Sequence, residues 1–167
     1  YSFGTGLVAD GTGILLNNEM DDFSAKPGTP NGYGLIGGEA NAIEPNKRPL
    51  SSMTPVMVFK DGKLKLLTGS PGGSRIITAV LQIISNVIDH DMNIASATHT
   101  PRFHHQWLPD VLFVERELNQ DTVELLEGMG YKVKRSSTIG ATQSIQVEDY
   151  IYGSADPRRP NAEAAGY

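Results

Sequence analysis

The chain has 167 residues, a formal net charge of -5, 39% hydrophobic residues and 20% charged residues. This composition is that of an ordinary globular protein, and the length predicts a single domain over residues 1–167. The negative charge without a Lys/Arg cluster argues against a nucleic-acid partner, and no apolar run is long enough to cross a membrane. Because cysteine is absent, the sequence excludes disulfides and thiolate chemistry.

Three carboxylates lie close together near the start of the chain, at Glu19, Asp21 and Asp22. They follow a predicted turn at residues 10–13, which separates two short apolar segments. Glu19 and Asp22 are three residues apart, so one helical turn places both on the same face. Such a pair suits an ammonium group or a divalent metal. An acidic turn that only faces solvent is the alternative.

Residues 25–38 are rich in proline and glycine, which favours neither a helix nor a central strand. Long loops inside compact domains are often active-site lids, and Tyr33 is the natural gate of such a lid. The alternative is a mobile surface loop on which Tyr33 merely packs. Further along, Ser51 and Ser52 precede a predicted strand without a Gly-x-Ser-x-Gly elbow. We therefore expect them to hydrogen-bond to a ligand or to backbone rather than to act as nucleophiles.

An Asp61-Gly62 pair between the apolar runs 55–59 and 63–67 predicts a β-hairpin. A helix is expected to begin near Ser74, whose side chain suits an N-cap. Helical spacing gives this helix two adjacent apolar rows, which we expect to pack between a sheet and another helix or subunit. The rows are Ile76, Val80, Ile83 and Val87, and beside them Ile77, Leu81, Ile84 and Ile88.

Gly72 and Gly73 lie between the predicted hairpin and the predicted helix. Without a Cβ, adjacent glycines let backbone N–H groups point outward. These amides lie beside a helix N-terminus, where free donors and the helix dipole favour negative charge. The pattern predicts an anion site for a carboxylate, a phosphate or the oxyanion of an acyl-transfer intermediate. A tight strand-to-helix turn that binds nothing is the alternative, and the absence of a Gly-x-x-x-x-Gly-Lys-Ser/Thr pattern counts against phosphate.

The second half of the chain adds further helices and strands. The adjacent histidines His104 and His105 are candidate metal ligands. However, the side chains of neighbouring residues point apart on a regular helix or strand, and neither histidine has a second histidine four residues away. We therefore expect structural histidines and no metal. The order of strands and helices predicts an α+β fold, with sheet packed on sheet and helices outside. The expected helices are 93–97 and 119–130, and the expected strands are 112–115, 131–134 and a hairpin within 144–153.

Four ordered motifs give the chain a resemblance to a known family. They span residues 13–24, 46–53, 69–77 and 101–109, and they resemble the small subunit of a bacterial gamma-glutamyltranspeptidase. The resemblance implies an N-terminal-nucleophile hydrolase fold, a four-layer αββα sandwich completed with a large subunit. It also implies self-cleavage of a precursor, no metal and no organic cofactor, and a periplasmic or secreted location.

The resemblance also assigns roles to the residues singled out above. It makes Gly72 and Gly73 the backbone donors of an oxyanion hole. It makes Glu19 and Asp22 the acceptors for the α-ammonium of a gamma-glutamyl group. It makes Ser51 and Ser52 the hydroxyls that bind the substrate α-carboxylate, together with an arginine of the large subunit. It makes residues 25–38 a lid, with Tyr33 as its gate.

The family's nucleophile is an N-terminal threonine whose own α-amino group is the base. Neither Thr5 nor Thr12 lies in that context, so we expect no nucleophile within this chain. The implied reaction transfers the gamma-glutamyl group of glutathione or glutamine to water, an amino acid or a peptide. The alternatives are a cephalosporin (glutaryl-type) acylase of the same fold and a non-catalytic binding or structural subunit. The acidic pair at Glu19 and Asp22 argues against a plain glutaryl substrate.

Overall fold

The computed structural model describes residues 4–166 and divides into two compact units, Tyr1–Ser52 and Met53–Tyr167. The prediction of a single domain over residues 1–167 stays a prediction.

Short helical turns and isolated bridges, rather than a regular sheet, organise the first unit. The 3-10 helices are η1 (Glu19–Asp22) and η2 (Glu39–Asn41). The predicted turn at residues 10–13 is confirmed, because the backbone amide of Ala9 donates to the carbonyl of Ile14 at 2.9 Å and the flanking segments form a bridge. Glu19 and Asp22 are the first and last residues of η1, so the condition under which the two carboxylates share a face is met.

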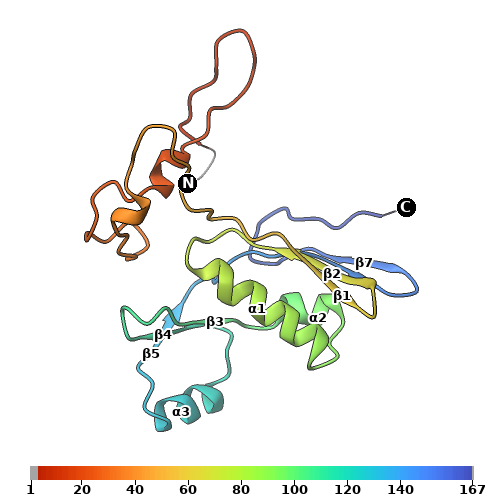
Figure 1. Ribbon diagram of the computed structural model, residues 1–167. Helices are drawn as coiled ribbons and strands as arrows, with labels where there is room; N and C mark the ends of the chain where they lie inside the picture. The colour runs from red at the N-terminus through yellow and green to blue at the C-terminus, as the bar shows by residue number, and fades with distance from the viewer. Residues whose placement is uncertain (1–3, 167) are drawn as a thin grey trace. The chain divides into compact units, whose positions relative to one another are not determined.

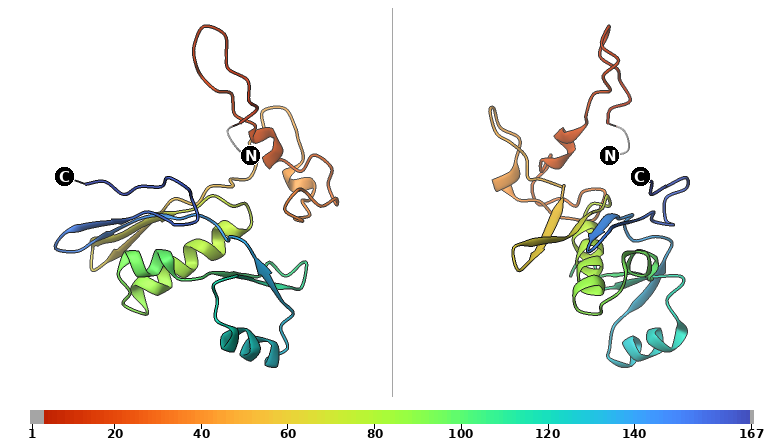
Figure 2. Two further views of the ribbon diagram at one scale, coloured as in Figure 1. Left: turned by 180° about the vertical axis from the view of Figure 1, so that it is seen from behind. Right: turned by 90° about the vertical axis from the view of Figure 1, so that its right-hand side faces the viewer.

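The second unit is built on a four-stranded antiparallel sheet of order β1-β2-β6-β7 (Figure 1). Asp61 and Gly62 connect the first two strands with positive φ angles of 51° and 74°, which confirms the predicted hairpin. The two views of Figure 2 show helices α1 and α2 on one face of this sheet. The elements are β1 (Val56–Lys60), β2 (Lys63–Gly69), α1 (Arg75–Ile88), α2 (Ile94–His99), β6 (Gln143–Val147) and β7 (Ile151–Ser154).

A smaller three-stranded sheet has the order β3-β4-β5. Its strands β4 and β5 are parallel, and α3 connects them as a crossover. The predicted strand 131–134 is therefore displaced by two residues, because pairing with β4 decides which residues are extended. The elements are β3 (Phe103–His104), β4 (Leu112–Glu115), α3 (Gln120–Gly128) and β5 (Val133–Ser136).

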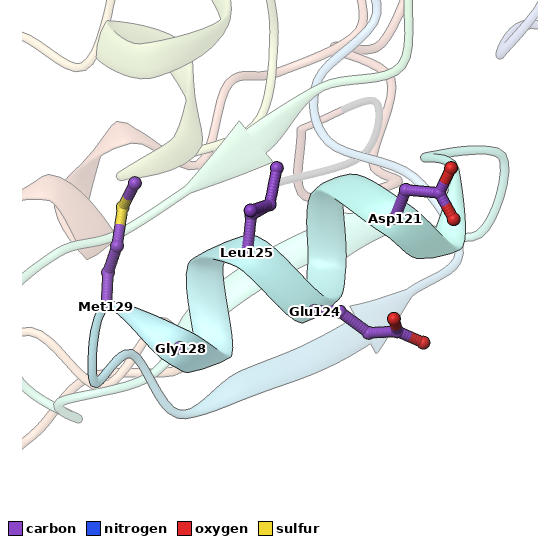
Figure 3. A pocket seen from close by; sticks show the side chains of 5 residues that line it. All are labelled: Asp121, Glu124, Leu125, Gly128 and Met129. Atoms are coloured by element: carbon purple, nitrogen blue, oxygen red, sulfur yellow. The ribbon is translucent and has the colours of Figure 1, made fainter.

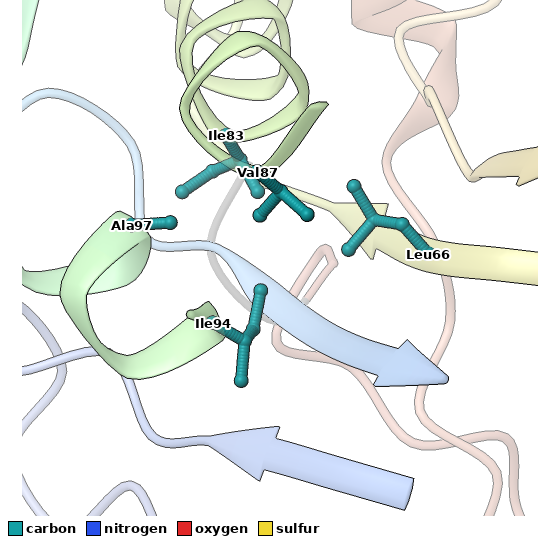
Figure 4. Close-up of a cluster of buried hydrophobic side chains, with 5 residues drawn as sticks. All are labelled: Leu66, Ile83, Val87, Ile94 and Ala97. Carbon is teal, nitrogen blue, oxygen red and sulfur yellow. The ribbon is translucent and has the colours of Figure 1, made fainter. Parts of the chain in front are cut away.

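The main core lies between α1, α2 and the large sheet. Side chains from all three meet in one cluster, formed by Leu66, Ile83, Val87, Ile94 and Ala97 (Figure 4). The first predicted apolar row of α1 is buried, as expected. The second row is only partly covered by the described residues: Ile77 is 69% exposed and Leu81 is 60% exposed, whereas Ile84 packs against the core cluster. Within residues 4–166, no helix combines the length and the apolar character that a membrane span needs.

A buried ionic cluster lies in the second unit and contains two arginines and two carboxylates. Arg102 is 1% exposed and its guanidinium contacts the Asp156 carboxylate at 2.8 Å. Arg158 pairs with both Asp156 and Glu115. The charges balance inside the cluster, so its four members are held in place by one another. The sequence analysis gave none of these residues a role.

Candidate active site

The loop between β2 and α1 presents two free backbone amides. Gly72 and Gly73 have φ angles of 137° and 58°, a region that L side chains rarely adopt. Their carbonyls accept from the amides of Arg75 and Ile76, both at 3.1 Å, which starts the first turn of α1. Within residues 4–166, neither the Gly72 nor the Gly73 amide donates a hydrogen bond. The structure therefore has the free donors that the sequence predicts.

Ser70 ties this loop to a second segment of the unit. Its hydroxyl donates to the carbonyl of Pro71 at 2.8 Å and accepts from the backbone amide of Ala141 at 3.0 Å. The approach is possible because residue 140 is glycine: a Cβ there would lie 2.6 Å from the Ser70 hydroxyl oxygen. The conformation of the loop between β2 and α1 is thus fixed by contacts with Gly140 and Ala141, which lie outside the loop.

Helix α1 begins directly after Ser74, as predicted, but the Ser74 side chain does not cap it. Its backbone is already helical, with φ -58° and ψ -25°, so its hydroxyl caps no amide of α1. The hydroxyl donates instead to Oε1 of Gln106 at 2.6 Å. That same oxygen lies 3.0 Å from Nε2 of His104, while the Gln106 amide nitrogen donates to the carbonyl of Leu108. With the Gln106 amide group in this orientation, Oε1 of Gln106 accepts from both the Ser74 hydroxyl and Nε2 of His104.

The contacts of His104 fix its tautomer. Because Gln106 presents an oxygen, Nε2 of His104 carries the proton, and Nδ1 then accepts from the Thr78 hydroxyl at 2.8 Å. Both ring nitrogens are engaged. His105 is similarly occupied, through Asp110 at 3.2 Å and the Trp107 amide at 3.1 Å. Neither imidazole offers a free nitrogen, which agrees with the expectation of structural histidines.

His104 is expected to titrate below its ordinary pKa. Burial lowers the pKa of His104 from 6.5, and the nearby Arg75 charge adds to this, although the Gln106 hydrogen bond opposes it. With the folded pKa below the unfolded one, stability from this residue is complete above about pH 6.5 and is lost as pH falls toward the folded pKa. NMR titration with labelled histidine checks this, and a His104 pKa at or above 6.5 would contradict it.

In the first unit, η1 brings a carboxylate and a hydroxyl together. The Ser52 hydroxyl donates to Oδ1 of Asp22 at 2.9 Å. Asn41 makes this contact possible, because its side chain donates to the Asp22 carbonyl at 2.7 Å and accepts from the Leu50 amide at 2.9 Å. The Glu19 carboxylate is exposed and has no partner among residues 4–166. Sequence reasoning missed Asn41, since nothing local marks an asparagine that joins two distant segments.

Tyr33 lies at the tip of a small closed loop in the segment 25–38. A bridge between Pro30 and Ile36 closes the loop, which the sequence alone did not predict. The side-chain oxygen of Asn31 accepts from the amides of Tyr33 and Leu35 at 2.9 Å and 3.0 Å. The loop therefore has a defined shape, and its use as a lid stays a prediction.

The hydroxyls of Thr5 and Thr12 are both used inside turns. Thr5 donates to the carbonyl of Leu16 at 3.3 Å, and Thr12 donates to the carbonyl of Ala9 at 2.8 Å. Each hydroxyl oxygen also accepts a backbone amide two residues further on. These contacts are those of turn-forming residues, which supports the expectation that neither is a nucleophile.

An open pocket on α3 contains none of the predicted site residues (Figure 3). Its lining residues come from α3 and the turn after it, and the side chains of Leu125 and Met129 are 66% and 72% exposed. The lining is completed by Asp121, Glu124 and Gly128. No serine, threonine, cysteine or histidine lines this pocket.

The comparisons with known proteins agree on one family. The model of the family described as gamma-glutamyltranspeptidase matches residues 1–166. The chain is 61% identical over 168 residues to the glutathione hydrolase proenzyme of Escherichia coli (strain K12), covering 99% of this chain and 29% of that protein. The chain spans 29% to 31% of the length of three such curated relatives.

Solved structures of this family have the same fold. A crystal structure of Helicobacter pylori gamma-glutamyltranspeptidase is 56% identical, with a TM-score of 0.88, and the match covers 95% of this chain and 88% of that chain. The Pseudomonas nitroreducens gamma-glutamyltranspeptidase complexed with L-DON is 41% identical, with a TM-score of 0.86 over 100% and 89% of the two chains.

The fold and these likenesses place the chain in the class of N-terminal-nucleophile hydrolases, which confirms the predicted α+β architecture. The free amides at the start of α1 are the kind of donor group that acyl transfer in this class requires. Within this class, the chain belongs to the gamma-glutamyltranspeptidase family, as the sequence motifs predict.

Proposed function

We propose that this chain supplies the oxyanion hole and the substrate contacts of an enzyme that hydrolyses and transfers gamma-glutamyl groups. The observation that carries the proposal is the pair of free amides at Gly72 and Gly73, in a chain that the family matches over residues 1–166. Amides held in a preformed loop stabilise a developing oxyanion without reorganising during the reaction. A glutathione hydrolase proenzyme at 61% identity supports glutathione as a substrate.

The acidic site of the first unit suits the amino-acid end of the substrate. Asp22 and Glu19 supply acceptors for an α-ammonium group, and charge-assisted hydrogen bonds to such a cation are stronger than neutral ones. Ser51 and Ser52 supply hydroxyls for the α-carboxylate. Without substrate the Ser52 hydroxyl donates to Asp22 at 2.9 Å. Because a hydroxyl has one proton, we propose that it turns from Asp22 to the α-carboxylate when the substrate binds, which frees Asp22 for the ammonium group. A gamma-glutamyl group carries both charges, whereas a glutaryl group has no ammonium.

The reaction proceeds through a gamma-glutamyl-enzyme ester. An N-terminal threonine outside the described residues attacks the gamma-carbonyl, its α-amino group takes the proton, and the amine of the leaving group departs protonated. Water, an amino acid or a peptide then cleaves the ester. A large subunit of the same precursor completes the enzyme, and the loop around Tyr33 limits the entry of water. On the resemblance alone, we place the enzyme in the periplasm or outside the cell.

The test uses the assembled enzyme that contains this chain. Release of nitroaniline from gamma-glutamyl-p-nitroanilide, together with a second polypeptide and a fragment beginning with threonine in the mass spectrum, is the expected result. Glutaryl-p-nitroanilide is the matched substrate without the α-amino group. Faster cleavage of the glutaryl compound would favour an acylase, and binding of glutamate without any cleavage would favour a non-catalytic subunit.

Asp22→Asn is expected to raise KM for gamma-glutamyl-p-nitroanilide about 10- to 100-fold, since a hydrogen bond to a charged group contributes roughly 1.5–3 kcal/mol. The neutral amide keeps the size of the side chain but loses the charge that attracts the ammonium group. Asp21→Asn is the matched control, because Asp21 is the exposed neighbouring carboxylate. Steady-state kinetics of both variants decides the point: equal KM values would remove Asp22 from the substrate site.

A further inference from the structure

The peptide group between Pro71 and Gly72 is held on one side only. Its carbonyl, from Pro71, accepts from the Ser70 hydroxyl at 2.8 Å. Its N–H, from Gly72, has no partner among residues 4–166. The group is planar and trans, so the carbonyl and the N–H point in opposite directions. Whatever fixes the direction of the carbonyl therefore also fixes the direction of the Gly72 amide.

The backbone on either side resists rotation of this plane only weakly. The proline ring sets φ at residue 71, but ψ of Pro71 and φ of Gly72 remain free to turn the peptide group. Glycine has no Cβ that would select one orientation, and the observed φ of 137° lies in a region that glycine enters without cost. The direction of the amide must therefore be determined by a contact from outside the peptide group.

Ser70 is suited to that task because its own hydroxyl is fixed. The hydroxyl oxygen accepts from the Ala141 amide at 3.0 Å, on a segment 71 residues further along the chain. With that acceptor position filled, the hydroxyl proton is directed to the Pro71 carbonyl. Gly140 lets the two segments approach, since a Cβ there would lie 2.6 Å from the hydroxyl oxygen and 2.9 Å from the Ala79 Cβ.

We propose that Ser70 is a positioning residue that aims the Gly72 amide at the oxyanion through its hydrogen bond to the Pro71 carbonyl. This inference rests on the proposed function of the glycine loop. Ser70 touches neither the substrate nor the reacting atoms, and it acts on the rate by holding one donor in the direction where negative charge develops. Its loss leaves substrate binding intact and weakens the stabilisation of the transition state.

The experiment compares Ser70→Ala with Ser154→Ala in the assembled enzyme. Ser154 is a matched control, because its hydroxyl also donates to the carbonyl of the following residue, Ala155, at 3.5 Å. We expect Ser70→Ala to lower kcat for gamma-glutamyl-p-nitroanilide about 10- to 100-fold, less than the roughly 100- to 1000-fold loss from removing a whole donor. KM should stay within about twofold, as for an interaction made only in the transition state. Ser70→Thr keeps the hydroxyl and should recover most of the rate.

A second readout separates positioning from a general structural effect. A boronic acid analogue of the gamma-glutamyl group reacts with the threonine nucleophile and forms a tetrahedral, negatively charged adduct that resembles the oxyanion intermediate. Free glutamate forms no such adduct. Ser70→Ala should weaken binding of the boronate by the same factor as kcat and leave the affinity for glutamate unchanged. Equal kcat in Ser70→Ala and Ser154→Ala, or equal weakening of boronate and glutamate, would overturn the inference.

The proposed function and the inference can fail separately. If the unsubstituted assembled enzyme cleaves no gamma-glutamyl compound, the proposed function is wrong. A crystal structure of Ser70→Ala then decides the inference: a rotated Pro71–Gly72 peptide supports it, and an unchanged peptide orientation overturns it.

Discussion

Gly72→Ala is expected to lower kcat for gamma-glutamyl transfer roughly 100- to 1000-fold, the usual cost of losing one oxyanion donor. Space is not the reason, because a Cβ at this position would make only ordinary contacts, the nearest being 3.5 Å from the Cα of Gly140. The reason is the φ angle of 137°, which an alanine adopts only with strain. The backbone can relieve the strain by rotating, and rotation turns the amide away from the oxyanion.

Gly62→Ala is the control for strain alone. Gly62 also has a positive φ, 74°, and open space around its Cα, but it lies in the β1–β2 turn. Both substitutions should cost about 1–2 kcal/mol of stability, which thermal unfolding measures. Only Gly72→Ala should lose activity in the nitroanilide assay. If Gly72→Ala retains the kcat of Gly62→Ala, the Gly72 amide is not an oxyanion donor.

The features that sequence analysis predicted correctly are those that local chemistry determines. The Asp61-Gly62 turn needs two residues that tolerate positive φ, and the sequence supplies them between two apolar runs. The first apolar row of α1 follows from the helical period alone. The free amides of the glycine loop were likewise predicted, because glycines have no Cβ to cover their N–H groups and the first amides of a helix have no partner within the helix.

Features that depend on distant partners were missed or misplaced. Ser74 has the chemistry of an N-cap, but its hydroxyl donates to Gln106, which lies 32 residues away. The start of β5 depends on its parallel pairing with β4, and the alternating pattern of residues 131–134 does not contain that information. The contact between Ser52 and Asp22 spans 30 residues and depends on Asn41. In each case the local sequence permits the interaction without selecting it.

The buried ionic cluster is the clearest example of such a distant contact, since 54 residues separate Arg102 from Asp156. Asp156 also accepts from the Thr142 amide at 2.6 Å and from the Arg158 amide at 3.0 Å. Burial alone would raise the pKa of Asp156, but these amides and the Arg102 guanidinium outweigh it and lower the pKa below 3.8. The carboxylate is therefore charged in the folded protein, and its charge holds two arginines in the interior.

Asp156→Asn is expected to lower the free energy of unfolding by about 3–5 kcal/mol, the usual cost of breaking a buried ion pair by removing one partner. Asparagine has nearly the same volume, so no cavity forms, but two buried guanidinium groups are left with the single carboxylate of Glu115. In the unsubstituted protein, the stability from Asp156 is complete above pH 3.8 and is lost as pH falls through the lower folded pKa. Urea unfolding of the assembled protein measures the difference.

Glu44→Gln is the matched control, because Glu44 pairs with Lys47 at 3.1 Å and its side chain is 62% exposed. An exposed pair of this kind contributes only about 0–1 kcal/mol, since water screens the charges. The Arg102–Asp156 pair differs mainly in burial, so the contrast between the two variants isolates the effect of the interior. If Asp156→Asn costs no more than Glu44→Gln, the Asp156 charge contributes little to holding the arginines, and the hydrogen bonds that an asparagine oxygen can still accept are sufficient to hold them.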